Sequence, residues 1–129
     1  MEITFDGGKV ITAHTSNHSI RTDQPVKAGG ENSAPSPFEL FLAAIGTCAG
    51  IYIKSFCDQR NIPSEKIKII QTMEYDLQTG LPTNITLDIQ LPVDFPDKYE
   101  DAVISSAELC KVKKTIANPP VFKVKTTQI

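Results

Sequence analysis

Short hydrophobic runs alternate with polar turns over the first part of the chain. The runs are rich in Ile, Val and Thr and cover residues 1–5, 9–15 and 18–22. Asp6-Gly7-Gly8 and Ser16-Asn17 separate them, and residues of these types favour tight turns between strands. We therefore predict three β-strands, followed by an irregular Gly- and Pro-rich connection over residues 23–37.

The next segment has the pattern of a long, buried helix. Ser36 suits the cap position, Pro37 suits the first helical position, and Glu39 follows the serine by three residues, as in a capping box. Apolar residues then occupy every face, so the helix requires protein on all sides. We expect it to begin at Pro37 and to end near Asn61-Ile62-Pro63, because the residue before a proline is biased away from helical geometry.

The remaining pattern predicts two strands, a second helix and a last strand. They cover residues 66–75 and 84–91, joined by a turn at 79–82, then 97–114 and finally 121–127. Alternating apolar residues indicate the strands, apolar residues three or four apart indicate the helix, and Asn118-Pro119-Pro120 ends that helix. The order βββ–α–ββ–α–β predicts an α+β fold, with helices packed on antiparallel sheet, in a single domain over residues 1–129.

Composition and charge exclude several classes of protein. Thirteen Lys and Arg face fifteen Asp and Glu, for a net charge of −2, and the longest basic run is Lys113-Lys114, so we expect no nucleic-acid partner. The uncharged apolar stretch, residues 40–53, is shorter than the ~20 residues that span a bilayer, so we expect no membrane association. The N-terminal MEITFDGGKV lacks the apolar centre of a secretory signal, which predicts a cytoplasmic protein. His14 and His18 lie in strand and turn segments without a third ligand, so we predict no metal site.

The three cysteines, Cys48, Cys57 and Cys110, are too few and too widely spaced for a disulfide scaffold. Cys48 lies on the apolar helix and Cys110 on the inward stripe of the second helix, so both face one core. At about 100° per residue, Cys57 points to the opposite side of its helix from Cys48. Cys48 and Cys110 are therefore the plausible couple, although the residues alone favour the simpler alternative that free cysteines only fill the core.

The segment from Ile20 to Cys48, IRTDQPVKAGGENSAPSPFELFLAAIGTC, resembles the signature of the OsmC/Ohr family, in its shorter OsmC-like branch. In that family a Gly-rich loop and a Pro-x-Glu-Leu start lead to a helix that bears the reactive cysteine. Cys110, Asn118-Pro119 and residues 121–127 match the family's second cysteine, the break after it and its last strand. The resemblance implies an intertwined homodimer, each subunit wrapping a six-stranded antiparallel sheet on two long helices.

The resemblance also implies an enzyme, a thiol peroxidase that defends against oxidative stress. Cys48 would attack an organic hydroperoxide and become a sulfenic acid, and Cys110 would close a disulfide that a dithiol reductant reopens, without any cofactor. Glu39 matches the family's glutamate, which holds a thiolate-stabilising arginine, and Arg21 is the candidate for that arginine. Glu39 has the capping box as its other possible role. The apolar substrate pocket would be lined by Leu40, Phe41, Ile45, Ile51 and Tyr52.

Two other functions stay open from the sequence. Arg21 does not stand where the family's pattern places its arginine, so a non-catalytic dimer that binds a small apolar or thiol-reactive ligand at the Cys48 pocket is the alternative. A structural dimer with inert core cysteines is the third. Hydroperoxide turnover, ligand binding without turnover, and thiols inert to alkylation would distinguish the three.

Overall fold

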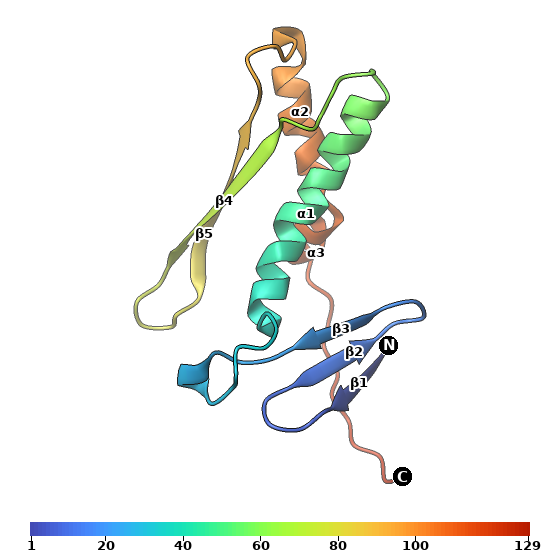
Figure 1. Cartoon of the computed structure of the whole chain (residues 1–129), viewed down its shortest axis with the longest axis vertical. Helices are drawn as coiled ribbons and strands as arrows, with labels where there is room; N and C mark the ends of the chain where they lie inside the picture. Colours follow the sequence, from blue (N-terminus) through green and yellow to red (C-terminus); the bar gives the residue numbers. More distant parts are fainter. The chain divides into compact units, whose positions relative to one another are not determined.

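A computed structural model of the chain describes all 129 residues. The residues divide into two compact units, Met1–Ala44 and Ile45–Ile129, and the boundary falls within helix α1 (Figure 1). Each unit is described by itself. The single-domain organisation expected from the chain length stays a prediction.

The first unit begins with a three-stranded antiparallel sheet of order β1-β2-β3. Its strands are β1 (Glu2–Phe5), β2 (Ile11–His14) and β3 (Ser19–Thr22). Gly7 and Gly8 both have positive φ in the first turn, which glycine adopts without steric cost. The second turn is closed by a bond from the Thr15 N–H to the His18 carbonyl. The three predicted strands and both predicted turns are confirmed.

The loop after β3 is organised by one buried carboxylate. Asp23 is 1% exposed and accepts bonds from the backbone N–H groups of Gln24, Glu31 and Ser33 and from the Ser33 hydroxyl. These bonds, that of the Ser33 N–H first, lower the pKa of Asp23 from 3.8 to about 2. A Cβ at Gly30 would lie 2.0 Å from the Gln24 carbonyl oxygen, so this loop admits no side chain there. The predicted irregular segment is therefore a fixed loop that includes the short 3₁₀ turn η1 (Val26–Ala28).

In the Asp23→Asn variant, we expect the free energy of unfolding to depend less on pH in the acid range than in the wild type. The carboxylate stabilises the fold fully above its ordinary pKa of 3.8, and that contribution is lost as the pH falls towards about 2, because the pKa is lower in the folded chain. Urea unfolding followed by circular dichroism between these pH values measures the effect. Asp88→Asn, at an exposed carboxylate of the second unit, is the matched control. Equal acid dependence in Asp23→Asn and the wild type would contradict the assignment.

Helix α1 (Pro37–Asp58) follows the predicted course. The Ser36 N–H donates to the Glu39 carboxylate over 2.7 Å, and the Glu39 N–H donates to the Ser36 hydroxyl over 3.3 Å, so the capping box forms. At the other end Asn61 has φ 53°, and the N–H groups of Asn61 and Ile62 return to the carbonyls of Asp58 and Cys57. This left-handed cap ends the helix just before Pro63.

The second unit carries an antiparallel hairpin of β4 (Lys68–Tyr75) and β5 (Pro82–Gln90). The Asp76 carboxylate binds the N–H groups of Gln78 and Thr79 in the turn, which confirms the predicted hairpin. Pro82, predicted in the turn, is the first residue of β5, a position where its missing N–H breaks no central ladder bond.

The predicted second helix is broken into three pieces. A 3₁₀ turn, η2 (Asp97–Tyr99), leads into α2 (Glu100–Glu108), and a separate α3 (Lys111–Ala117) follows. Between them Cys110 has φ −46° and ψ 117°, which is not helical, and its sulfur caps α3 by accepting the Lys113 N–H. The prediction of one continuous helix over residues 97–114 was therefore wrong, because this cap starts a new helix at Lys111.

The last predicted strand is absent. Residues 118–129 form neither helix nor strand, and apolar side chains among them are exposed, with Val124 at 97%. A strand needs a neighbour to satisfy its backbone groups, and β1 to β3 pair only among themselves, as do β4 and β5. The chain thus has five strands in two sheets, and the six-stranded sheet is not formed within it.

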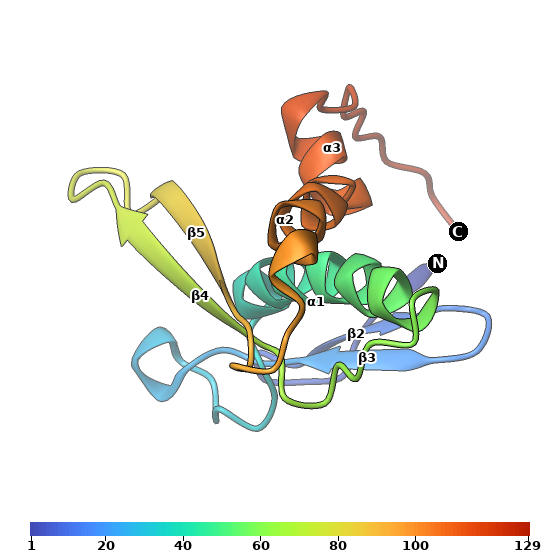
Figure 2. The same cartoon turned by 90° about the horizontal axis from the view of Figure 1, so that it is seen from above.

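The core of the second unit lies between α1, α2 and the hairpin (Figures 1 and 2). Its buried members are Ala49, Ile53, Cys57, Phe95, Val103 and Ala107. By length and composition alone α1 could cross a membrane, since its most apolar 18 residues have a mean hydropathy of 1.6. Core helices of globular proteins meet the same criterion, and three of the buried core residues belong to α1. In the single chain Phe41 and Ile51 of α1 are 39% and 59% exposed, so burial of this helix on all faces, which was expected with a second copy, stays a prediction.

Candidate active site

Cys48 and Cys110 meet where α3 begins. Cys48 is half-buried on α1, and Cys110 is fully buried between α2 and α3; both are free thiols. The Cys110 sulfur accepts the Lys113 N–H over 3.4 Å and lies 3.9 Å from the Ile45 carbonyl oxygen on α1. The two thiol groups lie close enough for each to shift the pKa of the other. The structure thus brings together the couple expected from the sequence, while Cys57 lies apart in the core.

The surroundings of Cys48 favour its thiolate. Its pKa is lowered first by the Val112 N–H, then by the Cys110 thiol, and further by the N–H and the ammonium charge of Lys111. These N–H groups belong to the first turn of α3, which has no carbonyl partners for them within the helix. Backbone N–H groups thus favour the Cys48 thiolate, a role that the family pattern gives to an arginine.

Cys110 has the opposite electrostatic character. Burial raises its pKa, and the neighbouring Cys48 thiolate raises it further. At neutral pH the pair therefore consists of a thiolate-prone Cys48 and a protonated Cys110, whose S–H donates to the Ile45 carbonyl. A nucleophile beside a second thiol is the arrangement that forms a disulfide after oxidation.

This use of the start of α3 was missed by sequence reasoning. The apolar residues from Tyr99 to Cys110 keep a helical period, so the pattern does not indicate the break between α2 and α3. Cysteine is also not a usual N-cap residue. The only signal in the sequence is the position of Cys110 directly before Lys111 and Val112, whose backbone groups act on Cys48.

Two substitutions at Lys111 should separate the effects of its backbone N–H and of its ammonium charge on the pKa of Cys48. Lys111→Ala removes the ammonium group, and Lys111→Pro removes the N–H as well, at a first helical position that accepts proline after an extended residue. The pKa of Cys48 should rise in Lys111→Ala and further in Lys111→Pro. The pH dependence of Cys48 alkylation, followed by mass spectrometry, measures it. Lys114→Ala is the control on the same helix, and identical profiles for the two Lys111 variants would exclude the N–H contribution.

Four of the other predicted site residues belong to the first unit. Glu39 forms the capping box described above, and its bonds to Ser36 lower its pKa. Arg21 is exposed on β3, where its guanidinium lies 3.4 Å from the Ser33 hydroxyl. Both belong to the first unit, as do Leu40 and Phe41. A role for these residues at the thiol pair stays a prediction.

A largely apolar cavity of about 380 Å³ shares two residues with the surroundings of Cys110, although neither cysteine lines it. These two are Ile45, whose carbonyl accepts the Cys110 S–H, and Lys113, whose N–H donates to the Cys110 sulfur. The rest of the lining is Ile85, Leu87, Glu108, Ile116 and Ala117. Of the predicted pocket residues only Ile45 lines this cavity. Ile51 is exposed and Tyr52 is half-buried. No group of three or more metal-ligating side chains is gathered in the structure.

A comparison with models of protein families identifies the family of this chain. The model of the OsmC-like proteins matches residues 30–125, which include all three cysteines and the last residues of the loop before α1. The chain belongs to the OsmC-like family. Membership of this family implies a redox or peroxide-related role. A search of curated proteins gives no match.

Solved structures show the OsmC-like α+β fold for this chain. A candidate osmotic-stress-induced and detoxification-response protein from Psychrobacter arcticus is 22% identical, with a TM-score of 0.74 over 88% of this chain and 85% of that one. The organic hydroperoxide resistance protein OsmC of Legionella pneumophila is 17% identical, with a TM-score of 0.53 over 89% and 85%. OhrB of Bacillus subtilis is 21% identical, with a TM-score of 0.51 over 91% and 90%.

Proposed function

We propose that this OsmC-like protein is a cysteine-based peroxidase that reduces organic hydroperoxides to alcohols. The observation that carries the proposal is the pairing of a thiolate-prone Cys48 with a protonated, buried Cys110 at the start of α3. Two of the similar structures are named as organic hydroperoxide resistance proteins, which supports the same substrate class.

The proposed reaction needs only these two sulfurs and an external reductant. The Cys48 thiolate attacks the terminal oxygen of the hydroperoxide, the O–O bond breaks, and the alkoxide takes a proton from water and leaves as the alcohol. Cys48 is then a sulfenic acid. The Cys110 sulfur attacks the Cys48 sulfur, a disulfide forms, and the hydroxyl leaves as water with the Cys110 proton. A dithiol then exchanges with the disulfide and restores both thiols.

The largely apolar cavity lined by the Cys110 neighbours Ile45 and Lys113 supports an organic substituent on the peroxide. Its Ile and Leu side chains offer the bound substituent a site removed from water, whereas hydrogen peroxide gains nothing from them. Selectivity for organic over inorganic peroxide therefore follows from the proposal.

A homodimer and a cytoplasmic location complete the proposal. The exposed apolar side chains of α1, among them Ile51, would be covered by a second copy of the chain. A reducing compartment fits a chain whose three cysteines are all free thiols.

The rate of peroxide-dependent disulfide formation tests the proposed function. Reduced protein is mixed with cumene hydroperoxide, tert-butyl hydroperoxide or hydrogen peroxide, and the Cys48–Cys110 disulfide is quantified by mass spectrometry. We expect faster disulfide formation with both organic peroxides. Failure to form the disulfide with any of the three would overturn the proposal and favour a non-catalytic protein that binds a ligand at the Cys48 pocket.

A further inference from the structure

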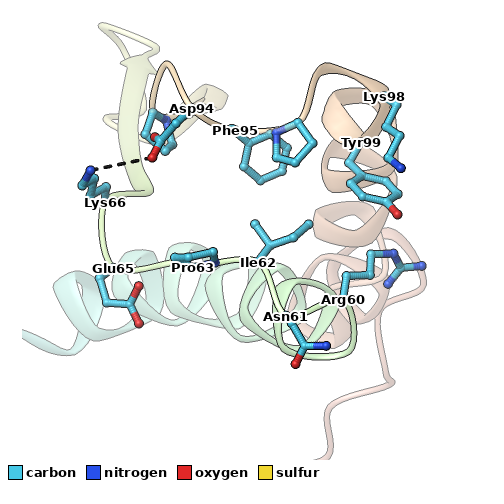
Figure 3. A pocket seen from close by; sticks show the side chains of 12 residues that line it. Arg60, Asn61, Ile62, Pro63, Glu65, Lys66, Asp94, Phe95, Lys98 and Tyr99 are labelled. Carbon is cyan, nitrogen blue, oxygen red and sulfur yellow. Dashed lines mark ion pairs between the residues drawn. The ribbon is translucent and has the colours of Figure 1, made fainter.

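A larger cavity lies at the opposite end of α1 from its cap, within the second unit (Figure 3). Its volume is about 620 Å³, within the range of ~300–1,000 Å³ that is usual for small-molecule sites. The residues around it come from the end of α1 and the segment after it, and from the segment that connects β5 to α2. Neither Cys48 nor Cys110 lines it, and Asp58 at the end of α1 is ten residues beyond Cys48, roughly 15 Å along the axis.

One side of this cavity is apolar. Phe95, which is 5% exposed, and Ile62 point into it from two different segments (Figure 3), and Pro63 and Pro96 also line it. Prolines and a buried ring hold this surface in place before any ligand arrives, because they have little conformational freedom to lose. The surface suits an aromatic or branched apolar group.

The other side carries positive charge without an acidic partner. Five charged side chains line the cavity, three basic and two acidic, and Lys66 pairs with Asp94 over 3.8 Å. Arg60, Lys98 and Glu65 remain, and none of them forms an ion pair in the structure. The lining therefore carries an excess of positive charge, and neither Arg60 nor Lys98 is neutralised by an ion pair.

The guanidinium of Arg60 is fixed before any ligand binds. It lies 3.8 Å from the centre of the Phe56 ring and 5.7 Å from that of Tyr99, and one N–H donates to the Phe56 carbonyl over 3.2 Å. Lys98 lies 4.9 Å from the same Tyr99 ring. An arginine held by stacking offers its remaining N–H groups in a fork that matches a carboxylate.

We propose that this cavity is a binding site for a small organic carboxylate, with its anionic end at Arg60 and Lys98 and its apolar body on Phe95 and Ile62. The site is separate from the thiol pair and uses no redox chemistry. It is therefore independent of the peroxidase proposal, and either can fail without the other.

Binding of phenylbutanoate to the reduced full-length protein tests this site. Isothermal titration gives the affinity, and amide chemical-shift changes locate the ligand. We expect binding of phenylbutanoate, with shifts at residues 60–66 and 92–99, and at least about tenfold weaker binding of the neutral phenylbutanol, the cationic phenylbutylamine and the short butanoate, because each lacks one of the two contacts.

Variants of the two cations complete the test. Arg60→Gln and Lys98→Gln should each weaken phenylbutanoate binding by about tenfold, with Arg60→Lys intermediate because it keeps the charge but loses the fork. Lys27→Gln, outside the cavity, is the matched control and should bind like the wild type. Equal affinity for the acid and the alcohol, unchanged binding in Arg60→Gln, or shifts confined to the cavity beside Cys110 would each overturn the proposal.

Discussion

Replacement of Cys48 by serine should abolish the turnover of organic hydroperoxides, with a loss of at least about a thousandfold. The hydroxyl of serine is not ionised at neutral pH, and the backbone donors of α3 that lower the pKa of a thiol do not make it a comparable nucleophile. Consumption of cumene hydroperoxide with an excess of dithiol measures the effect.

Two further cysteine variants make the result specific. Cys110→Ser should still consume one equivalent of hydroperoxide and leave Cys48 as a sulfenic acid, because only the second step needs the buried thiol. Cys57→Ala removes a thiol that lies in the core of the second unit, apart from Cys48 and Cys110, and the variant should retain turnover. Full activity in Cys48→Ser would remove the proposed nucleophile.

The second large effect is expected on stability, at Ile53. This side chain is 3% exposed in the core of the second unit, and Ile53→Ala should lower the free energy of unfolding by about 2–5 kcal/mol through lost burial and the cavity left behind. Urea unfolding followed by circular dichroism measures the change.

Ile51→Ala is the matched control on the same helix. Ile51 is 59% exposed, so the same change in side chain should alter the unfolding free energy of a single chain by less than about 0.5 kcal/mol. If a second copy covers Ile51, its effect will instead appear as a stronger dependence of the unfolding midpoint on protein concentration. An Ile51→Ala variant as destabilised as Ile53→Ala at every concentration would contradict the assignment of the core.

The elements that the sequence predicts correctly are those whose signals are local. The capping box at Ser36 and Glu39, the paired glycines of the first turn and the alternation in β4 and β5 each act within a few residues, and the structure contains all of them. The resemblance carried by the segment from Ile20 to Cys48 predicted the family in the same way, because that motif is contiguous.

The failures concern features that depend on distant partners. Residues 121–127 alternate like a strand, yet no strand of the chain pairs with them, and alternation carries no information about a neighbour. The start of a new helix at Lys111 depends on a cap formed by the Cys110 sulfur, which also meets Cys48 from a different helix. A buried Asp23 was likewise hidden, because its donors lie up to ten residues away in an irregular loop.

The lowered pKa of Cys48 depends on main-chain N–H groups. The site is therefore more sensitive to the number of residues between α2 and α3 than to the identity of the side chains there. Most side chains at Val112 would leave its N–H in place, whereas one residue inserted between Glu108 and Val112 would displace the first turn of α3 and carry the donor away from the sulfur.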